Sequence, residues 1–285
     1  MGGHAFRVIA AYERWLKREE FEQEVTEETE KGKKRVSVPS VSSCSRILSV
    51  LRLLGLFDRP ADPGCLEALR KPPAIEGLTE PLGDLDEEDW NIPLTQLHEL
   101  GLISRHSSFS IHYSSLPIDA HPLVREYFAR QLQEQSPDGW RSAHRKLYEH
   151  LCETTEHQPD TLAGLQPLYQ AVAHGCQAGL EQQACEDVYR DRILRGTGWQ
   201  GFYSWTKLGA IGADLGAVAC FFERPWSRLS PSLSPAGQAW LLNEGAFYLR
   251  ALGRVTEAVE PMRAALEMRF EQEYWEDAAI IASNL

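Results

Sequence analysis

Apolar residues recur every three or four positions along most of the chain, a spacing that predicts a mainly helical protein. Residues 4–18 fit one short helix. The following stretch, 19–46, combines an acidic run, the basic cluster KGKKR and a Ser/Val/Pro segment, so it buries little apolar surface. We expect 19–46 to be a flexible charged linker or insertion. Because glutamates surround it, we interpret the basic cluster as part of a solvated linker instead of a nucleic-acid or sorting signal.

The pattern becomes compact from Ile47 onward. A helix is predicted for ILSVLRLLGLF, a turn and a second helix for DRPADPGCLEALRK, and a third helix for EEDWNIPLTQLHELG, with Pro93 in about its first turn. One apolar face of that third helix is expected to hold Trp90, Leu94, Leu97 and Leu100. Two short strands of a β-hairpin are predicted for LISRHSSFS and IHYSSLPID, followed by a closing helix in HPLVREYFARQL. This order is typical of a winged-helix domain, which we expect over 47–135.

Every segment of the remaining chain, 136–285, has a helical pattern. Two helical hairpins are predicted, turning at Gly179 and Gly253. Five residues after each glycine stands an alanine, Ala184 or Ala258, followed four positions later by a bulkier residue. This arrangement resembles a tetratricopeptide pattern, well over 239–269 and loosely over 165–192. We therefore expect a winged helix followed by a TPR-like helical repeat domain.

Charge and composition exclude several functional classes. A net charge of -12 and a pI near 5.3 argue against non-specific binding of polyanions. The stretch from Asp84 to Gly101 contains six acidic residues and no Lys or Arg, so we expect no DNA binding. No apolar run reaches the roughly 18 residues of a membrane span, and the N-terminus lacks a signal-peptide pattern. The six scattered cysteines predict reduced thiols, so we expect a cytoplasmic protein without membrane contact.

Catalytic and metal-binding motifs are absent from the sequence. It contains no G-x-x-x-x-G-K-[ST], no G-x-S-x-G and no H-E-x-x-H. The nearest thing to a metal cluster is a group of four residues, of which two point away from each other on a helix: His144, His150, Cys152 and His157. We therefore predict a protein that is not an enzyme by itself and has no metal or cofactor of its own.

Four segments carry a resemblance to a known family: HAFRVIAAYERWL, LRLLGLFDRPAD, LTQLHELGLIS and DAHPLVREYF. Together they resemble the C-terminal half of bacterial STAND-class signal-transduction NTPases (NB-ARC and NACHT-like). The resemblance implies that residues 1–18 end a preceding NTPase-associated region and that 136–285 is a truncated repeat domain. In this class the winged helix carries a Met-His-Asp motif whose histidine contacts the β-phosphate of ADP. Ala120, His121 and Pro122 fall on those positions, with Pro122 departing from the aspartate.

His121 therefore has two interpretations. It is either a helix-start residue packed against its neighbours or, by the resemblance, a sensor of the ADP phosphate that acts only with a P-loop module. A helix N-terminus is already favourable for phosphate, which supports the second interpretation. The resemblance also implies that ADP or ATP belongs to the parent assembly and that a separate P-loop NTPase module is a partner of the chain.

The last residues predict a contact surface. An apolar helical pattern without a polar finish continues through Trp275, Ala278, Ala279, Ile281, Ala282 and Leu285. We expect Trp275, Ile281 and Leu285 to be exposed and to bind a partner.

Our leading hypothesis is a non-catalytic regulatory and protein-interaction fragment of a STAND-type switch, with a winged-helix latch and sensor repeats. The alternatives are a freestanding TPR-like adaptor with a purely structural winged helix, and an acidic transcription factor.

Overall fold

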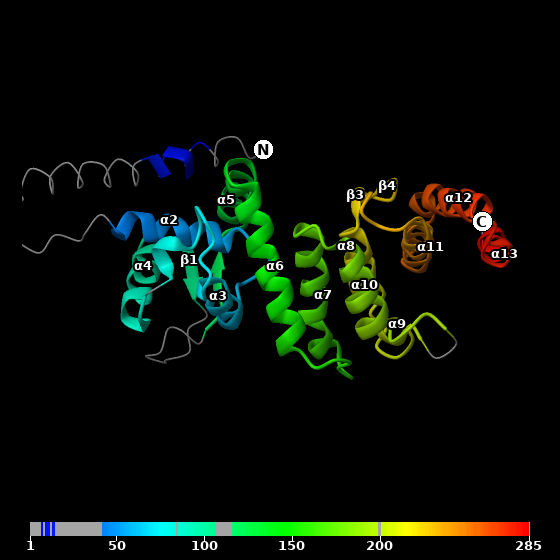
Figure 1. Cartoon of the computed structure of the whole chain (residues 1–285), viewed down its shortest axis with the longest axis horizontal. Coiled ribbons are helices and arrows are strands. Elements are labelled where there is room, and N and C mark those ends of the chain that lie inside the picture. Colours follow the sequence, from blue (N-terminus) through cyan, green and yellow to red (C-terminus); the bar gives the residue numbers. More distant parts are fainter. Residues whose placement is uncertain are drawn as a thin grey trace, which may run out of the picture. The chain divides into compact units, whose positions relative to one another are not determined.

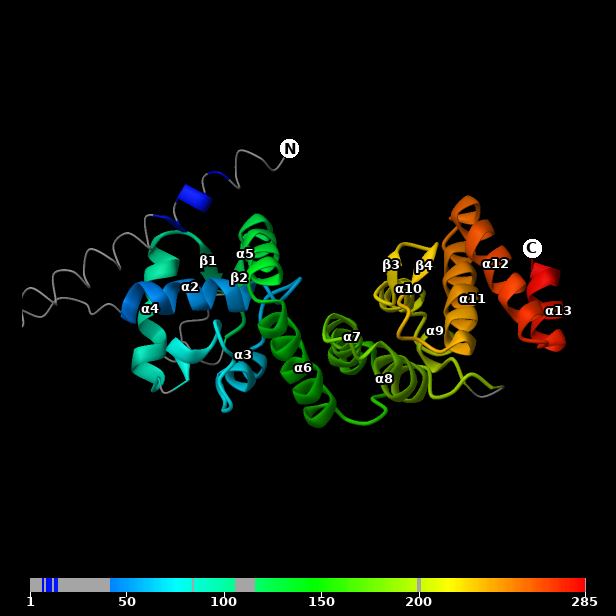
Figure 2. The ribbon, with the colours of Figure 1, turned by 45° about the horizontal axis from the view of Figure 1, so that its top comes forward.

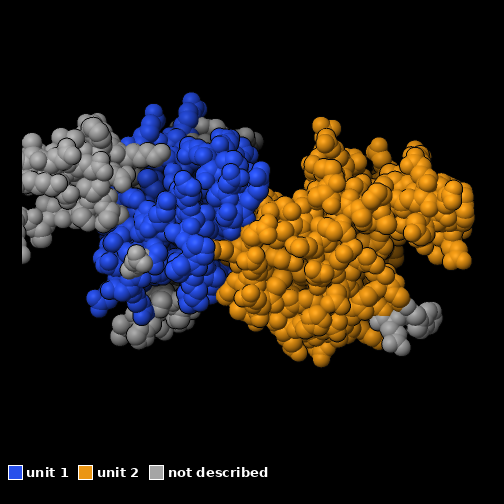
Figure 3. Space-filling view, viewed as in Figure 1, with its two compact units in different colours: residues 1–143 blue, residues 144–285 orange. Residues whose placement is uncertain are grey.

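The computed structural model describes residues 7, 9–11, 13–14, 42–83, 85–105, 116–198 and 201–284. This part of the chain is mainly helical, as the sequence pattern predicted at that coarse level, and has two small antiparallel strand pairs, of which only the first was predicted (Figure 1). The chain divides into two compact units, 1–143 and 144–285 (Figure 3). The boundary lies inside helix α6 (Pro137–Thr154), a few residues beyond the boundary expected from the sequence.

Unit 1 contains α2 (Ser42–Leu54), α3 (Pro63–Arg70), a 3-10 turn η1 (Glu80–Leu82), α4 (Glu87–Glu99) and α5 (Pro122–Gln135). The boundary expected for the end of the linker, residue 46, is wrong, because α2 begins at Ser42 and already buries Cys44. An apolar side chain at this position extends the buried face of α2 by one turn. The rest of the expected linker lies outside the described residues.

The strands β1 (Ile103–Arg105) and β2 (Ile118–Ala120) pair antiparallel, with Ile103 opposite Ala120. Both are shorter than the sequence predicted, and the segment between them lies outside the described residues. On the other side of β2, Ala61 forms a bridge to Ile118. The predicted strand pairing is therefore confirmed for three residues on each side.

The core of unit 1 forms where α2 packs on α4 and α5. Its fully buried side chains include Leu51, Leu94, Leu97 and Phe128. Two details of the predicted α4 are wrong. Leu100 caps the helix end and is largely exposed, because the helix stops before its next turn; Pro93 is buried inside the helix, beyond its first turn.

The described residues of the first predicted helix, 7, 9–11 and 13–14, are helical. Glu13 is buried and fixes this segment to α5. Its carboxylate accepts hydrogen bonds from the Tyr127 hydroxyl at 2.7 Å and from Gln131 Nε2 at 2.6 Å. Burial, followed by the hydrogen bond to Glu13, raises the pKa of Tyr127 to about 12. A long-range polar contact thus joins residues that the sequence pattern did not connect.

Unit 2 is built largely from helical hairpins. After α6 come α7 (Leu162–Gln177), the short α8 (Glu181–Gln183), a π-helix η3 (Ala184–Ile193), α9 (Tyr203–Thr206) and α10 (Ile211–Ala219). The chain ends in α11 (Pro235–Ala251), α12 (Val255–Glu271) and α13 (Trp275–Asn284), which lie side by side in both ribbon views (Figures 1 and 2).

Both predicted hairpin turns are confirmed. Gly179 and Gly253 have φ values of 76° and 77°, a backbone conformation that favours glycine. The alanines that follow, Ala184 and Ala258, are fully buried at the helix crossings. At the first crossing a Cβ on Gly175 would lie 2.8 Å from the Cβ of Ala184, so only glycine lets α7 approach η3 this closely.

Unit 2 is not entirely helical, which corrects the sequence analysis. Strands β3 (Phe222–Arg224) and β4 (Arg228–Leu229) pair antiparallel around Trp226, whose φ is 61°. The Trp226 ring packs on Phe222, with centroids 5.3 Å apart, and lies against Gly245 of α11. The Trp226 ring therefore packs this strand pair against α11. Among the described residues no helix is long and apolar enough to cross a membrane.

Candidate functional site

A groove of about 530 Å³ lies within unit 2, and we call it the unit 2 groove. Its walls come mainly from η3, α11 and α13, with one residue each from α8 and α12 and two from the segment between η3 and α9. It is lined by Gln182, Cys185, Glu186, Arg190, Thr197, Phe202, Ser234, Ala236, Gly237, Trp240, Asn243, Glu244, Arg269, Asp277, Ile280 and Ile281. The lining mixes charged, amide and large apolar side chains, a composition suited to binding part of another molecule.

The π-helix sets which side chains of η3 face the groove. In a π-helix the hydrogen bonds run from residue i to i+5, so Cys185 and Arg190 fall on one face together with Glu186. The Arg190 guanidinium carbon lies 5.1 Å from the centre of the Trp240 ring, within cation–π range. Arg190 forms no ion pair with any residue that the structure describes. It therefore offers a charged group to a ligand.

Helix α11 supplies the side chains at the base of the groove. Trp240, Asn243 and Glu244 follow one another at i, i+3 and i+4 and therefore share a face. Glu244 is only 5% exposed, and this burial raises the pKa of its carboxyl to about 7, although a hydrogen bond with Tyr248 acts against the rise. The Tyr248 hydroxyl in turn accepts a hydrogen bond from Tyr189 at 3.0 Å.

Another part of the groove lining contains an ion pair between a buried arginine and an exposed aspartate. Arg269 Nε lies 3.2 Å from Asp277 Oδ2 of α13, and Arg269 Nη1 donates to Gln272 at 3.0 Å. This arginine is therefore neutralised within the protein, which distinguishes it from Arg190.

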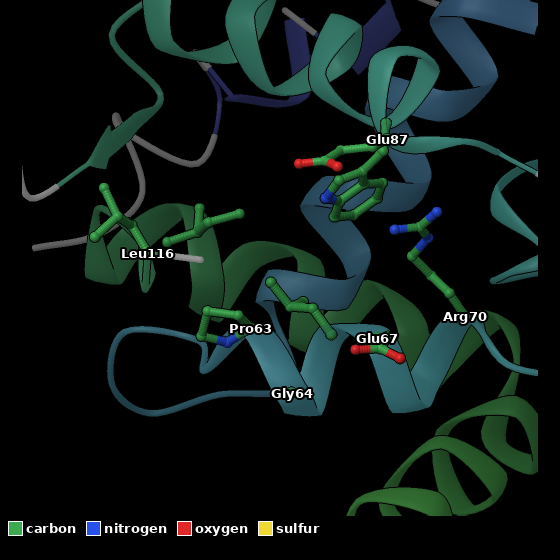
Figure 4. Close-up of a pocket in the computed structure, with 9 residues that line it drawn as sticks. Pro63, Gly64, Glu67, Arg70, Glu87 and Leu116 are labelled. Atoms are coloured by element: carbon green, nitrogen blue, oxygen red, sulfur yellow. The ribbon is translucent and has the colours of Figure 1, made fainter. Parts of the chain in front are cut away.

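A second cavity, of about 270 Å³, lies in unit 1 between α3, α4 and β2. Figure 4 shows Arg70 across this cavity from Leu116. The Arg70 guanidinium donates to the carbonyls of Leu82 and Leu85, at 3.4 and 2.7 Å, and its Cζ lies 4.3 Å from the Trp90 ring centre. Because backbone carbonyls and an indole already engage this cation, its role is to fix the segment before α4, and we assign no ligand here.

His121, the predicted phosphate-sensing residue, is the N-cap of α5. Its Nδ1 accepts a hydrogen bond from the Leu123 amide at 3.2 Å, which makes Nε2 the protonated ring nitrogen when the ring is neutral. The ring is exposed, so the first interpretation is right about the helix start but wrong about packing against neighbours.

The three residues predicted to form an exposed C-terminal contact surface differ in their exposure. Trp275 is 61% exposed, as expected, and its ring packs against that of Phe270, with the ring centroids 5.8 Å apart. Ile281 is only 3% exposed, so its predicted exposure is wrong, whereas its neighbour Ile280 is 61% exposed. The reason is the phase of α13, which turns Ala278 and Ile281 inward together. Leu285 lies outside the described residues.

The histidines and cysteines considered as a metal cluster are dispersed. His144 pairs with His174 inside unit 2, their Nδ1 atoms 2.8 Å apart, and burial followed by the neighbouring ring lowers the pKa of His144 well below its usual value. His157 lies 3.2 Å from Asp191 at the surface. Within the described ranges no group of three or more His, Cys, Asp or Glu is arranged to hold a metal ion. All six cysteines lie within these ranges, and none forms a disulfide.

Comparison with protein-family models, curated proteins and solved structures gave no match to this chain. The site therefore rests on its own geometry. Sequence reasoning missed Arg190, Asn243 and Glu244 as site residues. The i, i+3, i+4 spacing of Trp240, Asn243 and Glu244 was a usable signal, but nothing local to 184–193 indicated a π-helix.

Proposed function

We propose that this chain is a non-catalytic protein-interaction module that binds an extended segment of a partner protein in the unit 2 groove. The observation that carries the proposal is the groove itself, where η3 and α11 place a guanidinium without an ion pair beside an indole and an amide. Aromatic and arginine side chains are the residue types that contribute most to binding at protein interfaces.

The proposal agrees with the expected TPR-like repeat domain. The two helical hairpins, α7 with η3 and α11 with α12, have a glycine turn and a buried alanine at corresponding places. The π-helix and the β3–β4 strand pair depart from a simple repeat. In unit 1, helices α2, α3 and α4, the strand pair and α5 follow in the order expected for a winged helix, which supports that assignment.

A second function, the nucleotide latch of a STAND-type switch, has one observation in its favour. The His121 cap fixes a donor on exposed Nε2, at a helix N-terminus where phosphate is favoured. In that case ADP would bind to the chain only with a P-loop module, and His121→Ala would weaken binding by about ten-fold or more, the loss of one hydrogen bond to a charged group. Equal ADP affinity of wild type and variant would exclude this function.

Selection from a random-peptide phage library on the whole chain tests the interaction function. We expect enriched peptides to bind the wild type and to lose binding to Asn243→Arg, which fills the groove. The matched control is Thr256→Arg, which adds the same charge at an exposed position of α12 outside the groove lining. If all enriched peptides bind both variants equally, the groove is not the binding site and the proposal is wrong.

A further inference from the structure

We infer that the segment bound in the unit 2 groove carries an acidic side chain that pairs with Arg190, next to a bulky apolar side chain that packs on Trp240. This inference rests on the proposed function and specifies the chemistry of its partner. The partner is a peptide segment in extended conformation, recognised by one carboxylate, one apolar side chain and its backbone.

We infer a carboxylate on the partner from the ion pairing of the two arginines that line the groove. Arg269 forms an ion pair with Asp277 and donates a hydrogen bond to Gln272. Arg190 lies over Trp240 and forms no ion pair in the part of the chain that the structure describes, although it interacts electrostatically with the buried Glu244 carboxyl. An arginine held against an aromatic face keeps its planar set of donors free at the edge, and that edge matches a carboxylate in two-pronged geometry.

The acidic residues of the groove do not offer a comparable site for a cation. Asp277 is paired with Arg269 at 3.2 Å. Glu186 accepts a hydrogen bond at 2.6 Å from the neutral amide of Gln182 and keeps its charge, but it is exposed to solvent, where an ion pair contributes little to binding. Glu244 is buried at the base, where its raised pKa of about 7 leaves it partly protonated at neutral pH. Charge complementarity therefore favours an acidic residue over a basic one, even though the chain as a whole is negative.

The remaining lining residues explain why a peptide fits. Asn243 lies one turn from Trp240, and its side-chain amide makes no hydrogen bond within the described ranges. An amide offers both donors and an acceptor, which is the complement of a peptide group. Ile280, 61% exposed at the edge of the groove, adds an apolar surface for the side chain beside the acidic residue.

The test uses three short fluorescein-labelled peptides with blocked ends, identical except for a central Phe-Glu, Phe-Gln or Phe-Lys pair. Fluorescence anisotropy with the whole chain should show that the Phe-Glu peptide binds about ten-fold or more tightly than the Phe-Gln peptide, an advantage that added salt reduces. The Phe-Lys peptide should bind most weakly.

Variants of Arg190 locate the effect. In Arg190→Gln the advantage of the Phe-Glu peptide over the Phe-Gln peptide should disappear. Arg190→Lys, which keeps the charge and loses the planar fork, should be intermediate. Arg263→Gln, at an exposed arginine of α12 outside the groove lining, should bind all three peptides like the wild type.

Three results overturn the inference: a preference for Phe-Lys, a Phe-Glu preference that survives in Arg190→Gln, or no binding of any of the three peptides. They remain distinct from failure of the proposed function. Phage selection that yields neutral or basic peptides dependent on Asn243 leaves the groove as the binding site and removes only the acidic specificity. Selection that yields no peptide whose binding depends on the groove excludes both the groove as the binding site and its acidic specificity.

Discussion

Glu244 and Asp214 are buried carboxyl groups in unit 2, and both are held by hydroxyl groups. Asp214 is fully buried and accepts hydrogen bonds from Tyr169 at 2.7 Å and Ser204 at 2.8 Å. Burial raises the pKa of Asp214 to about 6 and that of Glu244 to about 7. A buried carboxyl group with a raised pKa favours folding in its protonated form. Unit 2 therefore contains carboxyl groups whose ionisation opposes folding near neutral pH.

Replacing Glu244 tests whether its ionisation opposes folding. The pKa of Glu244 is raised from 4.5 to about 7 in the folded state, so the folded chain binds more protons than the unfolded chain between these values. The stability that this group contributes is present below pH 4.5 and is lost as the pH rises through about 7. We predict that Glu244→Gln gains stability relative to the wild type as the pH rises across this range.

Denaturant unfolding of both proteins at several pH values measures the difference. A stability difference that stays constant from acidic to alkaline pH would show that Glu244 keeps an ordinary pKa.

The π-helix η3 carries two arginines with opposite roles. Arg190 faces the groove, whereas Arg192 is buried and donates hydrogen bonds to backbone carbonyls at the end of α6 and just after it. These carbonyls belong to Cys152, Thr155, Glu156 and His157, at 2.9–3.1 Å. Carbonyls at a helix C-terminus lack partners within the helix, so this side chain caps α6 from another element. The contact holds η3 to the end of α6 and to the residues that follow it.

We predict that Arg192→Met lowers the free energy of unfolding by about 3 kcal/mol, because four partly buried carbonyls lose a charged donor. Urea unfolding monitored by circular dichroism measures the effect. Arg263→Met, at an exposed arginine of α12, is the matched control and should change stability by less than about 0.5 kcal/mol. Equal stability of the two variants would contradict the capping role.

Two helical glycines of unit 2 should respond in opposite directions to alanine. A Cβ on Gly175 would meet Ala184 at 2.8 Å and Tyr148 at 3.0 Å, whereas one on Gly216 of α10 would meet nothing within 4 Å. We predict that Gly175→Ala destabilises the protein by about 1–3 kcal/mol. Gly216→Ala should stabilise it by about 0.5–1 kcal/mol, since glycine is unfavourable inside a helix. Thermal unfolding measures the melting temperatures of both variants. If both melting temperatures shift in the same direction, the close crossing of α7 and η3 is contradicted.

The sequence pattern predicted these elements unevenly, for physical reasons. The hairpin turns at Gly179 and Gly253 were predictable because a glycine with positive φ interrupts a clear helical periodicity. The β3–β4 pair was not, because its short strands depend on Trp226 packing against Gly245. Similarly, Ile281 and Ile280 are adjacent, and only the phase of α13 decides which is buried. The type of most helices followed from the local pattern, whereas the β3–β4 pair, the π-helix and the facing of side chains depended on tertiary contacts.

At the scale of the whole molecule, the chain consists of two compact units with different candidate chemistry. Unit 1 holds His121 at a helix start and a cavity whose cation is already engaged. Unit 2 holds the groove with Arg190, Trp240 and Asn243. The sequence analysis expected interaction surfaces in the repeat region but placed them on the last helix. The groove was missed because its residues come from separate elements that only the fold brings together.

Amide hydrogen exchange of the whole chain, with and without the most enriched phage-selected peptide, tests the central claim most directly. The peptide stabilises the segments that it contacts, so their local opening becomes rarer. Slower exchange should appear in η3, in α11 around 236–244 and in α13, whereas exchange in unit 1 should stay the same. Protection confined to unit 1, around His121 or the cavity beside Trp90, would contradict the assignment of the unit 2 groove as the binding site.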